Sequence, residues 1–558
     1  MQSFKYLTYV LCLGIVAFTT NAERPQNTYS TREPDSVEAR RVSQAFASWA
    51  KQYVARPARS GEAAETKIMA EGVRLARERR AALWHVARRE PGQVLAAKVP
   101  TSLRNLLPSS VQAELETPIS GSGDFLVFCE MPAPGARQAT AFQHRVRMNG
   151  RVYEAVVYGR RLSETTKFGI PLRGVLVNNV LVVDDQILAE IDSTESPGLT
   201  NSIVDLSAAA GPLAGTGPSV LAEMSGRIYR FASREHLNRS EALLEAAESG
   251  IRARASEPDA SLLERARFPQ SEIKAPAPRT NLPGGGSLAK VMVLRVDFPD
   301  LPGDPRSVYG PGVSYTAGAV ENTATNEVGP YYQNSSYGKA GLNFTVTPKL
   351  YRLPRTAGYY ASGAMEFELY DDAVKAVQSD YAVADYDQII VLFSCLSSIP
   401  NSQIQFGGLT LIGTSMVWVN GEFDFRVVAH ELGHAFGLYH ANFWQTSDAN
   451  PVGDNGSSIE YGDPFDTMAA NWGNDHRADF NPWFKYLLQW IGDDQVQTIT
   501  RNGLYRIFRF DDPHATGTLA LKIAKDADRD YWIGFRRNFS ENAGLQHGAY
   551  VVWGYHYA

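Results

Sequence analysis

The segment RVVAHELGHAFGLYHANF constrains the fold and chemistry of this chain more than any other part of the sequence. It places His430, Glu431, His434, Gly437 and His440 in the pattern H-E-x-x-H-x-x-G-x-x-H. Residues four positions apart lie on one face of a helix, so His430 and His434 can both reach one ion. Gly437 accepts a positive φ, which ends the helix and lets the chain return His440 toward the same point. The segment therefore predicts a helix, a sharp turn and three converging imidazoles.

These residue types indicate a catalytic metal site rather than a structural one. Three neutral imidazole nitrogens leave the fourth position of Zn²⁺ open, whereas structural zinc sites are closed by four protein ligands. Glu431 projects beside the two helical histidines and can hold a water without being a ligand itself. We therefore predict one catalytic Zn²⁺ ion bound by His430, His434 and His440, with Glu431 as the general base. Hydrogen-bonded core histidines are the alternative, and the complete pattern disfavours them.

Length and composition indicate a globular protein of several domains. The chain has 558 residues, of which 44% are hydrophobic and 20% are charged. Its formal net charge of −6 gives no reason to expect the basic surface that nucleic-acid binding needs, so nucleic acid is not an expected partner. Three cysteines are too few for a disulfide-based small fold.

The first 22 residues have the layout of a secretory signal peptide. Lys5 is followed by an apolar run of about 15 residues and then by small polar residues that end at Ala22. This run is short for a membrane span, and no later stretch supplies about 20 uncharged apolar residues. We therefore expect a secreted protein without a membrane anchor, extracellular or, in a Gram-negative bacterium, periplasmic.

Changes in residue pattern divide the first half of the chain. Region 23–273 has a predicted helical part at about 35–97, a β-rich part at about 124–192 and a second helical part at about 233–267. Asn-Gly at 149–150 is a strong hairpin signal within the β-rich part. A Pro- and Gly-rich linker follows at 274–287.

The remainder is predicted to comprise a catalytic domain at 288–493 and a small β-rich segment at 494–558. The expected elements are a strand at 289–298, a helix around 365–379, strands at 388–393 and 409–419, a helix within 482–491, and β-type runs that include LYRIFRF. The last residues are apolar and strand-like. They leave two interpretations open, a packed terminal strand and an incomplete chain.

Three segments of this second half together resemble the gametolysin-like branch of the metzincin zinc endopeptidases: HELGHAFGLYH, EYGDPFDTMAAN and FNPWFKYLLQWI. The resemblance covers roughly residues 289–558. It implies an α+β catalytic domain in which a twisted mixed sheet and the active-site helix border a substrate cleft. It also implies that Met468 lies in a methionine-containing turn beneath the metal. In such a fold, strand 409–419 would pair with an extended peptide substrate along a sheet edge.

The EYGDPFDTMAAN segment departs from some metzincins in one respect. Those proteins place a tyrosine two residues after the methionine, where it assists the transition state, but here that position is Ala470. Tyr461 is expected to fill an aromatic core position, with an approach to the site from elsewhere as the alternative, so we assign no tyrosine a catalytic role. Asp463 and Asp466 are expected to stabilise the turn by hydrogen bonds, with Ca²⁺ binding as the alternative.

Region 23–273 is predicted to be a prosegment that inhibits the catalytic domain within the same chain. It precedes that domain, and its charge is opposite: residues 1–280 carry 35 Lys and Arg against 30 Asp and Glu, and the remainder carries 19 against 30. A retained binding domain is the alternative. Cys129 has three open interpretations: a buried thiol, a disulfide with Cys395, and a thiolate that fills the open metal position.

The sequence thus predicts a secreted zinc-dependent metalloendopeptidase that hydrolyses peptide bonds. Two other functions stay open. One is a secreted binding or adhesion protein that carries an inactive protease-like domain, and the other is a zinc-dependent hydrolase of a non-peptide amide. The presence of Glu431 and all three histidines favours an active enzyme over the first alternative.

Overall fold

The computed structural model describes residues 34–555, except for 57–61, 133–141, 192–202, 208–217, 225–226, 249–286, 310–311, 364, 449, 451, 454, 470–475, 527–528, 540, 543–544 and 546–547. The expected signal peptide, Ala470 and all of the linker except Ser287 lie outside the described residues. The chain forms two compact units. The motif unit contains residues 128–142 and 279–558, and the N-terminal unit contains residues 25–127 and 143–278.

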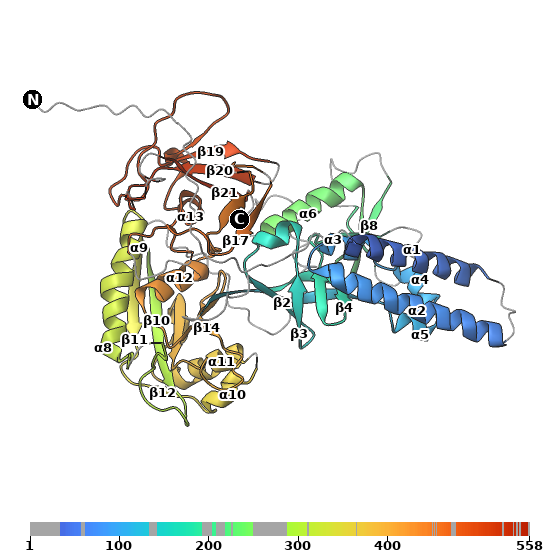
Figure 1. The fold of residues 1–558 in the computed structure, drawn as a ribbon, viewed down its shortest axis with the longest axis horizontal. Helices are drawn as coiled ribbons and strands as arrows, with labels where there is room; N and C mark the ends of the chain where they lie inside the picture. The colour runs from blue at the N-terminus through green and yellow to red at the C-terminus, as the bar shows by residue number, and fades with distance from the viewer. Residues whose placement is uncertain are drawn as a thin grey trace, which may run out of the picture. The chain divides into compact units, whose positions relative to one another are not determined.

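The N-terminal unit begins with helices (Figure 1). Its two long helices, α1 (Pro34–Ala55) and α2 (Glu62–Ala87), pack against each other. Its described residues also form the α-helices α3 (Pro91–Ala96), α4 (Thr101–Asn105), α5 (Ser109–Gln112) and α6 (Arg234–Glu248). Among the described residues, no helix combines the length and the apolar character that crossing a membrane requires.

Strands make up most of the rest of this unit. Five of them close into a ring in the order β1-β2-β3-β5-β4, because β4 also pairs with β1. A smaller sheet has the order β6-β8-β9-β7. The strands are β1 (Thr117–Pro132), β2 (Gln143–Met148), β3 (Arg151–Val156), β4 (Lys167–Val177), β5 (Val180–Val183), β6 (Ala189–Ile191), β7 (Ile203–Asp205), β8 (Val220–Met224) and β9 (Arg227–Phe231). Asn149 and Gly150 join β2 to β3 with φ of 52° and 72°, as a tight hairpin requires.

A mixed sheet organises the motif unit, which has the mixed α+β character that the sequence predicts. Its strand order is β11-β10-β13-β15-β14-β1, where β1 contributes residues 128–132, and β12 pairs with β10. The pairs β10–β11, β10–β13 and β13–β15 are parallel, whereas β14 is antiparallel to both β15 and β1. The strands are β10 (Ser287–Asp297), β11 (Ala340–Val346), β12 (Tyr351–Arg352), β13 (Gln388–Phe393), β14 (Phe406–Leu411) and β15 (Met416–Asn420).

The region 409–419, predicted as one strand, forms parts of two strands instead. β14 and β15 are antiparallel neighbours, and the chain reverses between them at Gly413, where φ is 75°. The Gly-Thr-Ser sequence at 413–415 supplies the turn, because glycine accepts positive φ and short hydroxyl side chains bond to nearby backbone. Only β14 therefore lies beside β1, and β15 lies inside the sheet.

Helices cover both faces of this sheet. They are the continuous helical stretch formed by α8 (Ala317–Asn322), a π-helical turn (Thr323–Val328) and α9 (Gly329–Ser335), together with α11 (Glu366–Val377) and α12 (Phe425–Ala435). Helix α10 (Ala357–Ala361) packs on α11, and α13 (Pro482–Leu487) contacts two strands of the C-terminal segment. Val417 and Val419 of β15 join the buried cluster around α12. Trp418 points to the opposite face, where its indole N–H donates to the Glu366 carbonyl of α11 at 2.8 Å.

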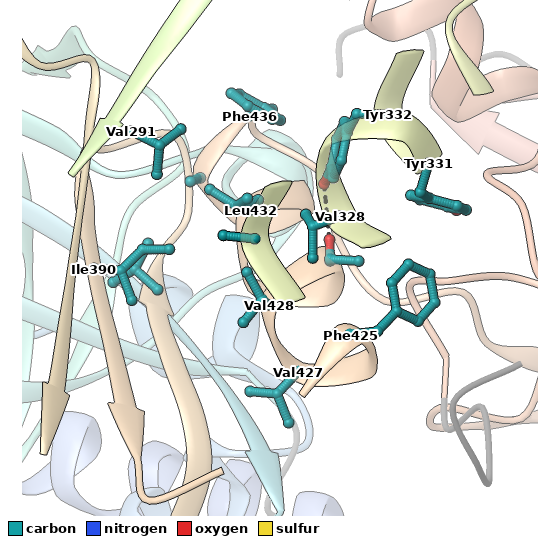
Figure 2. Packing of buried hydrophobic residues seen from close by; sticks show 14 of the residues in the cluster. Val291, Val328, Tyr331, Tyr332, Ile390, Phe425, Val427, Val428, Leu432 and Phe436 are labelled. Carbon is teal, nitrogen blue, oxygen red and sulfur yellow. Dashed lines mark hydrogen bonds between the residues drawn. The ribbon is translucent and has the colours of Figure 1, made fainter. Parts of the chain in front are cut away.

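The main core of the motif unit surrounds α12 (Figure 2). All residues of this helix except Arg426 are buried, and Val428 and Leu432 are among the apolar residues that pack there. The Tyr332 hydroxyl of α9 donates to the Ala429 carbonyl of α12 at 2.7 Å. The helix that carries the histidine motif is thus an internal element, held on a dry and close-packed surface.

The C-terminal segment 494–558 belongs to the same compact unit as region 288–493. It forms a four-stranded sheet in the order β18 (Val496–Thr498), β19 (Ala520–Ala524), β20 (Arg529–Gly534) and β21 (Tyr550–Tyr555). The LYRIFRF run, predicted as a strand, forms no strand, and Leu504 in it is 90% exposed. Buried Lys485 of α13 donates to Asp479 at 2.6 Å and to the Phe510 carbonyl at 3.1 Å, which joins the segment to the rest of the unit.

Gly433 in α12 provides a test of how tightly the core is packed. A Cβ atom at this position would lie 2.3 Å from Met468 Sδ. We predict that Gly433→Ala lowers the free energy of unfolding, because overpacking costs about 1–3 kcal/mol and the gain in helix propensity is only about 1 kcal/mol. Gly318→Ala in α8 is the matched control, since a Cβ there would meet nothing within 4 Å. Denaturant unfolding curves measure the difference, and equal stability of the two variants would contradict this packing.

Candidate metal centre

Local hydrogen bonds define both ends of α12. At its start, the Asp424 carboxylate accepts from the Val427 N–H at 2.9 Å. At its end, Gly437 has φ of 100°. Its N–H donates to the His434 carbonyl at 2.9 Å, and the Leu438 N–H donates to the Gly433 carbonyl at 3.0 Å. These two bonds form a Schellman motif, which turns the chain back toward the helix.

The turn brings three imidazole rings together. The ring centroids of His430 and His434 are 4.6 Å apart, and the His440 ring lies 5.3 Å and 4.9 Å from them. The Nε2 atoms of His430 and His434 are 2.9 Å apart. Burial lowers the pKa of all three imidazoles, so each is a neutral donor with a lone pair available for a cation.

The two helical histidines are oriented through their Nδ1 atoms. His430 Nδ1 lies 2.9 Å from the Thr467 carbonyl, and His434 Nδ1 lies 2.7 Å from the Leu438 carbonyl. A carbonyl can only accept, so each contact assigns the ring proton to Nδ1 and leaves the lone pair on Nε2. Two Nε2 lone pairs that face each other at 2.9 Å repel unless a cation or a proton lies between them.

The third histidine is oriented by a carboxylate. His440 Nδ1 donates to Glu460, and Asn442 Nδ2 donates to the other oxygen of Glu460 at 2.8 Å. This arrangement leaves the His440 lone pair on Nε2, directed away from Glu460. A carboxylate behind a ligating imidazole also raises the basicity of the ligand.

A cysteine from β1 completes the group. Cys129 is fully buried, and its Sγ lies 2.7 Å from His440 Nε2. One ligand atom from each of Cys129, His434 and His440 lies within 4.8 Å of the other two, so this buried group can hold a metal ion. Burial raises the pKa of the Cys129 thiol, so without a cation the sulfur keeps its proton and can donate to His440. Cys129 and Cys395 are both free thiols, so the structure contains no disulfide between them.

Glu431 lies between α12 and β14. Its carboxylate is fully buried, and its Oε2 accepts from the Thr410 hydroxyl at 2.6 Å. Among the described residues, none makes a hydrogen bond to its Oε1. A Cβ atom at Gly408 would lie 2.3 Å from Oε1, so only glycine leaves room for the carboxylate there. Burial raises the pKa of Glu431 to about 8, which makes the group a competent proton acceptor and donor near neutral pH.

Met468 packs against α12, and Asp466 supports the backbone beside it. Met468 is fully buried against Gly433, and its carbonyl accepts from the Ala441 N–H at 2.8 Å. Asp466 accepts from the backbone N–H groups of Met468 and Asn481, both at 2.8 Å. Asp466 therefore stabilises the turn by hydrogen bonds, the first of the two roles that the sequence left open.

Tyr461 does not lie in the core, where the sequence predicts it. It is half-buried, and its ring centroid lies 3.7 Å from that of His440 and 5.9 Å from that of His430. Its hydroxyl donates to the backbone carbonyl of Glu130. Tyr461 is thus in contact with both a candidate metal ligand and the strand that carries Cys129.

That strand pairs with the edge of β14 opposite β15. Residues 128–132 of β1 run antiparallel to β14, with Cys129 opposite Thr410 and Glu130 opposite Leu409. The register shifts after Met131. A segment of the chain itself therefore lies extended along β14, the strand within the region that the sequence assigned to substrate binding.

Four contributors to this site were not singled out from the sequence: Gly408, Thr410, Asn442 and Glu460. They come from β14, from the residues directly after His440 and from the turn before Tyr461, so no single periodic pattern connects them to the histidine motif. The one available signal is the Gly-Gly pair at 407–408, because glycine inside a strand often marks close approach of another group.

Comparison with known protein families and with curated protein sequences finds no match for this chain. The geometry of the site and its chemistry are therefore what indicate its function.

We predict that Glu460→Gln weakens zinc binding by about 10–100-fold, as expected for loss of a carboxylate behind a ligating histidine. Competition with a chromophoric chelator measures the affinity. Glu368→Gln is the matched control, because Glu368 accepts hydrogen bonds from the Tyr359 hydroxyl at 3.0 Å and 3.1 Å elsewhere in the motif unit. Equal affinities for the two variants would show that Glu460 does not support a metal ligand.

Proposed function

We propose that this protein is an exported zinc-dependent metalloendopeptidase. The observation that carries the proposal is the convergence of three imidazoles whose Nδ1 atoms are all engaged, beside a buried carboxylate with one unpartnered oxygen. His430, His434 and His440 would hold the ion. Nitrogen and sulfur donors are those that Zn²⁺ prefers, and three protein ligands leave a position for substrate and water. Export rests on the signal-like sequence at 1–22.

The residues of the chain have distinct tasks in the proposed hydrolysis. Bound Zn²⁺ would supply a Lewis acid that polarises the scissile carbonyl and lowers the pKa of water. Glu431 takes the proton of the attacking water through Oε1 and delivers it to the leaving amine as the C–N bond breaks. Thr410 holds Oε2 and so fixes the orientation of the carboxylate. The water oxygen forms the new C–O bond, and no covalent bond to the protein is needed.

The edge of β14 favours a peptide substrate over a non-peptide amide. An extended segment already pairs with this edge through five residues of β1. A substrate peptide would use the same backbone groups for affinity, while side-chain pockets would give specificity. Small non-peptide amides offer no such ladder of hydrogen bonds.

The proposal includes latency of the full chain. Cys129 Sγ lies beside His440 Nε2, where it can become a fourth ligand, and a bound cation stabilises the thiolate that burial alone disfavours. Four protein ligands make a closed site. The same strand covers β14. Region 23–273 therefore acts, in this proposal, as a prosegment that blocks both the metal and the substrate edge.

We predict that Cys129→Ser in the full zinc-loaded chain cleaves a peptide library roughly tenfold faster or more, since each 1.4 kcal/mol of lost coordination energy gives a factor of ten. Cys395→Ser is the matched control, because Cys395 is also a buried free thiol. Mass spectrometry of the products measures the rates. Latency is contradicted if Cys129→Ser and Cys395→Ser cleave at the same rate.

A second variant tests the general base. In the Cys129→Ser background, Glu431→Gln should lower kcat by about 10²–10⁴-fold, because the water proton then has no acceptor. Its zinc content should match that of the parent. Chelator should abolish cleavage by the parent, and added Zn²⁺ should restore it. Undiminished cleavage by the zinc-bound Glu431→Gln variant would refute this mechanism, and a parent that never cleaves would favour the binding-protein alternative.

A further inference from the structure

The proposed mechanism gives no task to Tyr461, a polar side chain that lies next to two of the candidate ligands. Its ring lies 3.7 Å from the His440 ring, yet its hydroxyl reaches past the imidazole to the Glu130 carbonyl. Simple aromatic packing would not require a hydroxyl at this point. The hydroxyl is directed at the backbone of the strand on β14.

The strand that contains Glu130 gives a view of how a peptide lies in the site. It is antiparallel to β14, with Cys129 opposite Thr410 and Glu130 opposite Leu409, and the Thr410 hydroxyl donates to the Glu431 carboxylate. Cys129, one residue earlier, has its sulfur against His440. The carbonyl that Tyr461 contacts therefore belongs to the part of the strand that lies at the metal ligands.

The backbone around Tyr461 holds the hydroxyl in a fixed position. Tyr461 has φ of 57°, a conformation that costs a non-glycine residue about 1–3 kcal/mol and persists where its surroundings enforce it. Its N–H donates to Asn442 Oδ1 at 3.0 Å. Asn442 also binds Glu460, the carboxylate behind His440. One short segment thus positions a metal ligand and the phenol together.

We propose that Tyr461 is a catalytic residue whose hydroxyl donates a hydrogen bond to the carbonyl oxygen of the peptide bond under attack. The Glu130 carbonyl is the stand-in for that oxygen in the latent chain. This inference rests on the proposed function. Negative charge gathers on the carbonyl oxygen as its carbon becomes tetrahedral, and a preorganised donor stabilises that charge more than it stabilises the ground state. Tyr461 keeps its proton throughout and forms no covalent bond.

The first test compares two tyrosine variants in the zinc-loaded Cys129→Ser full chain. Tyr461→Phe should lower kcat by roughly 10²–10³-fold with KM little changed, the effect of losing one oxyanion donor. Tyr337→Phe is the matched control, because Tyr337 also has a positive φ, 59°, and its hydroxyl also donates to a backbone carbonyl, that of Phe510 at 2.6 Å. It should leave kcat and KM close to those of the parent.

The second test uses the full chain with Cys129 intact and does not depend on turnover. Removing the Tyr461 hydroxyl should loosen the strand, so iodoacetamide should alkylate Cys129 faster in Tyr461→Phe than in wild type or Tyr337→Phe. Peptide mass spectrometry follows the modification. An unchanged alkylation rate would overturn the contact on which the proposal stands.

The kinetic results distinguish an error in the role of Tyr461 from an error in the proposed function. If the parent hydrolyses peptides but Tyr461→Phe keeps its kcat, the role of Tyr461 is overturned and the proposed function stands. Loss of zinc from Tyr461→Phe would also overturn the catalytic role of Tyr461, because the residue would then serve only to support His440. A parent without chelator-sensitive hydrolysis would overturn the proposed function and this inference with it.

Discussion

Three hydrogen bonds that Nδ1–H groups donate determine what this site can do. Backbone carbonyls hold the two helical imidazoles, and a carboxylate holds His440, so each ring keeps its lone pair on Nε2. The ligand atoms that all lie within 4.8 Å of one another belong to Cys129, His434 and His440, and His430 Nε2 lies 2.9 Å from His434 Nε2. Without these bonds a buried imidazole could rotate or carry its proton on the inner nitrogen. The Schellman turn at Gly437 supplies one of the carbonyls, that of Leu438, and also brings back the chain that carries His440. The same few residues therefore end the helix and orient the ligands.

The pairing of β1 with the edge of β14 explains how the proposed active site could stay inactive in the full chain. β14 would otherwise present unpaired backbone groups to any extended peptide. Residues 128–132 cover that edge, with the Cys129 sulfur against His440 and the Glu130 carbonyl bonded to Tyr461. In the proposed account, the contacts that silence the site are the contacts that a substrate would make. Latency and catalysis then depend on the same atoms.

The histidine helix and its turn could be predicted because local spacing encodes them. Helical periodicity places His430 and His434 on one face, and a glycine at 437 marks the point where the backbone needs a positive φ. The prediction of a single strand over 409–419 is wrong because a turn of small polar residues interrupts an otherwise strand-like run. Cys129 and Tyr461 could not be placed, because their neighbours are set by long-range strand pairing and by a strained backbone. Neither leaves a pattern in nearby sequence.

X-ray absorption at the zinc edge tests the central claim most directly. The account predicts one Zn²⁺ per full chain, with imidazole nitrogens at about 2.0–2.1 Å and one sulfur at about 2.3 Å. In Cys129→Ser, the sulfur signal should disappear while the imidazole signal stays. A chain that binds no zinc when all three histidines are intact, or a bound ion whose spectrum lacks imidazole scattering, would contradict it.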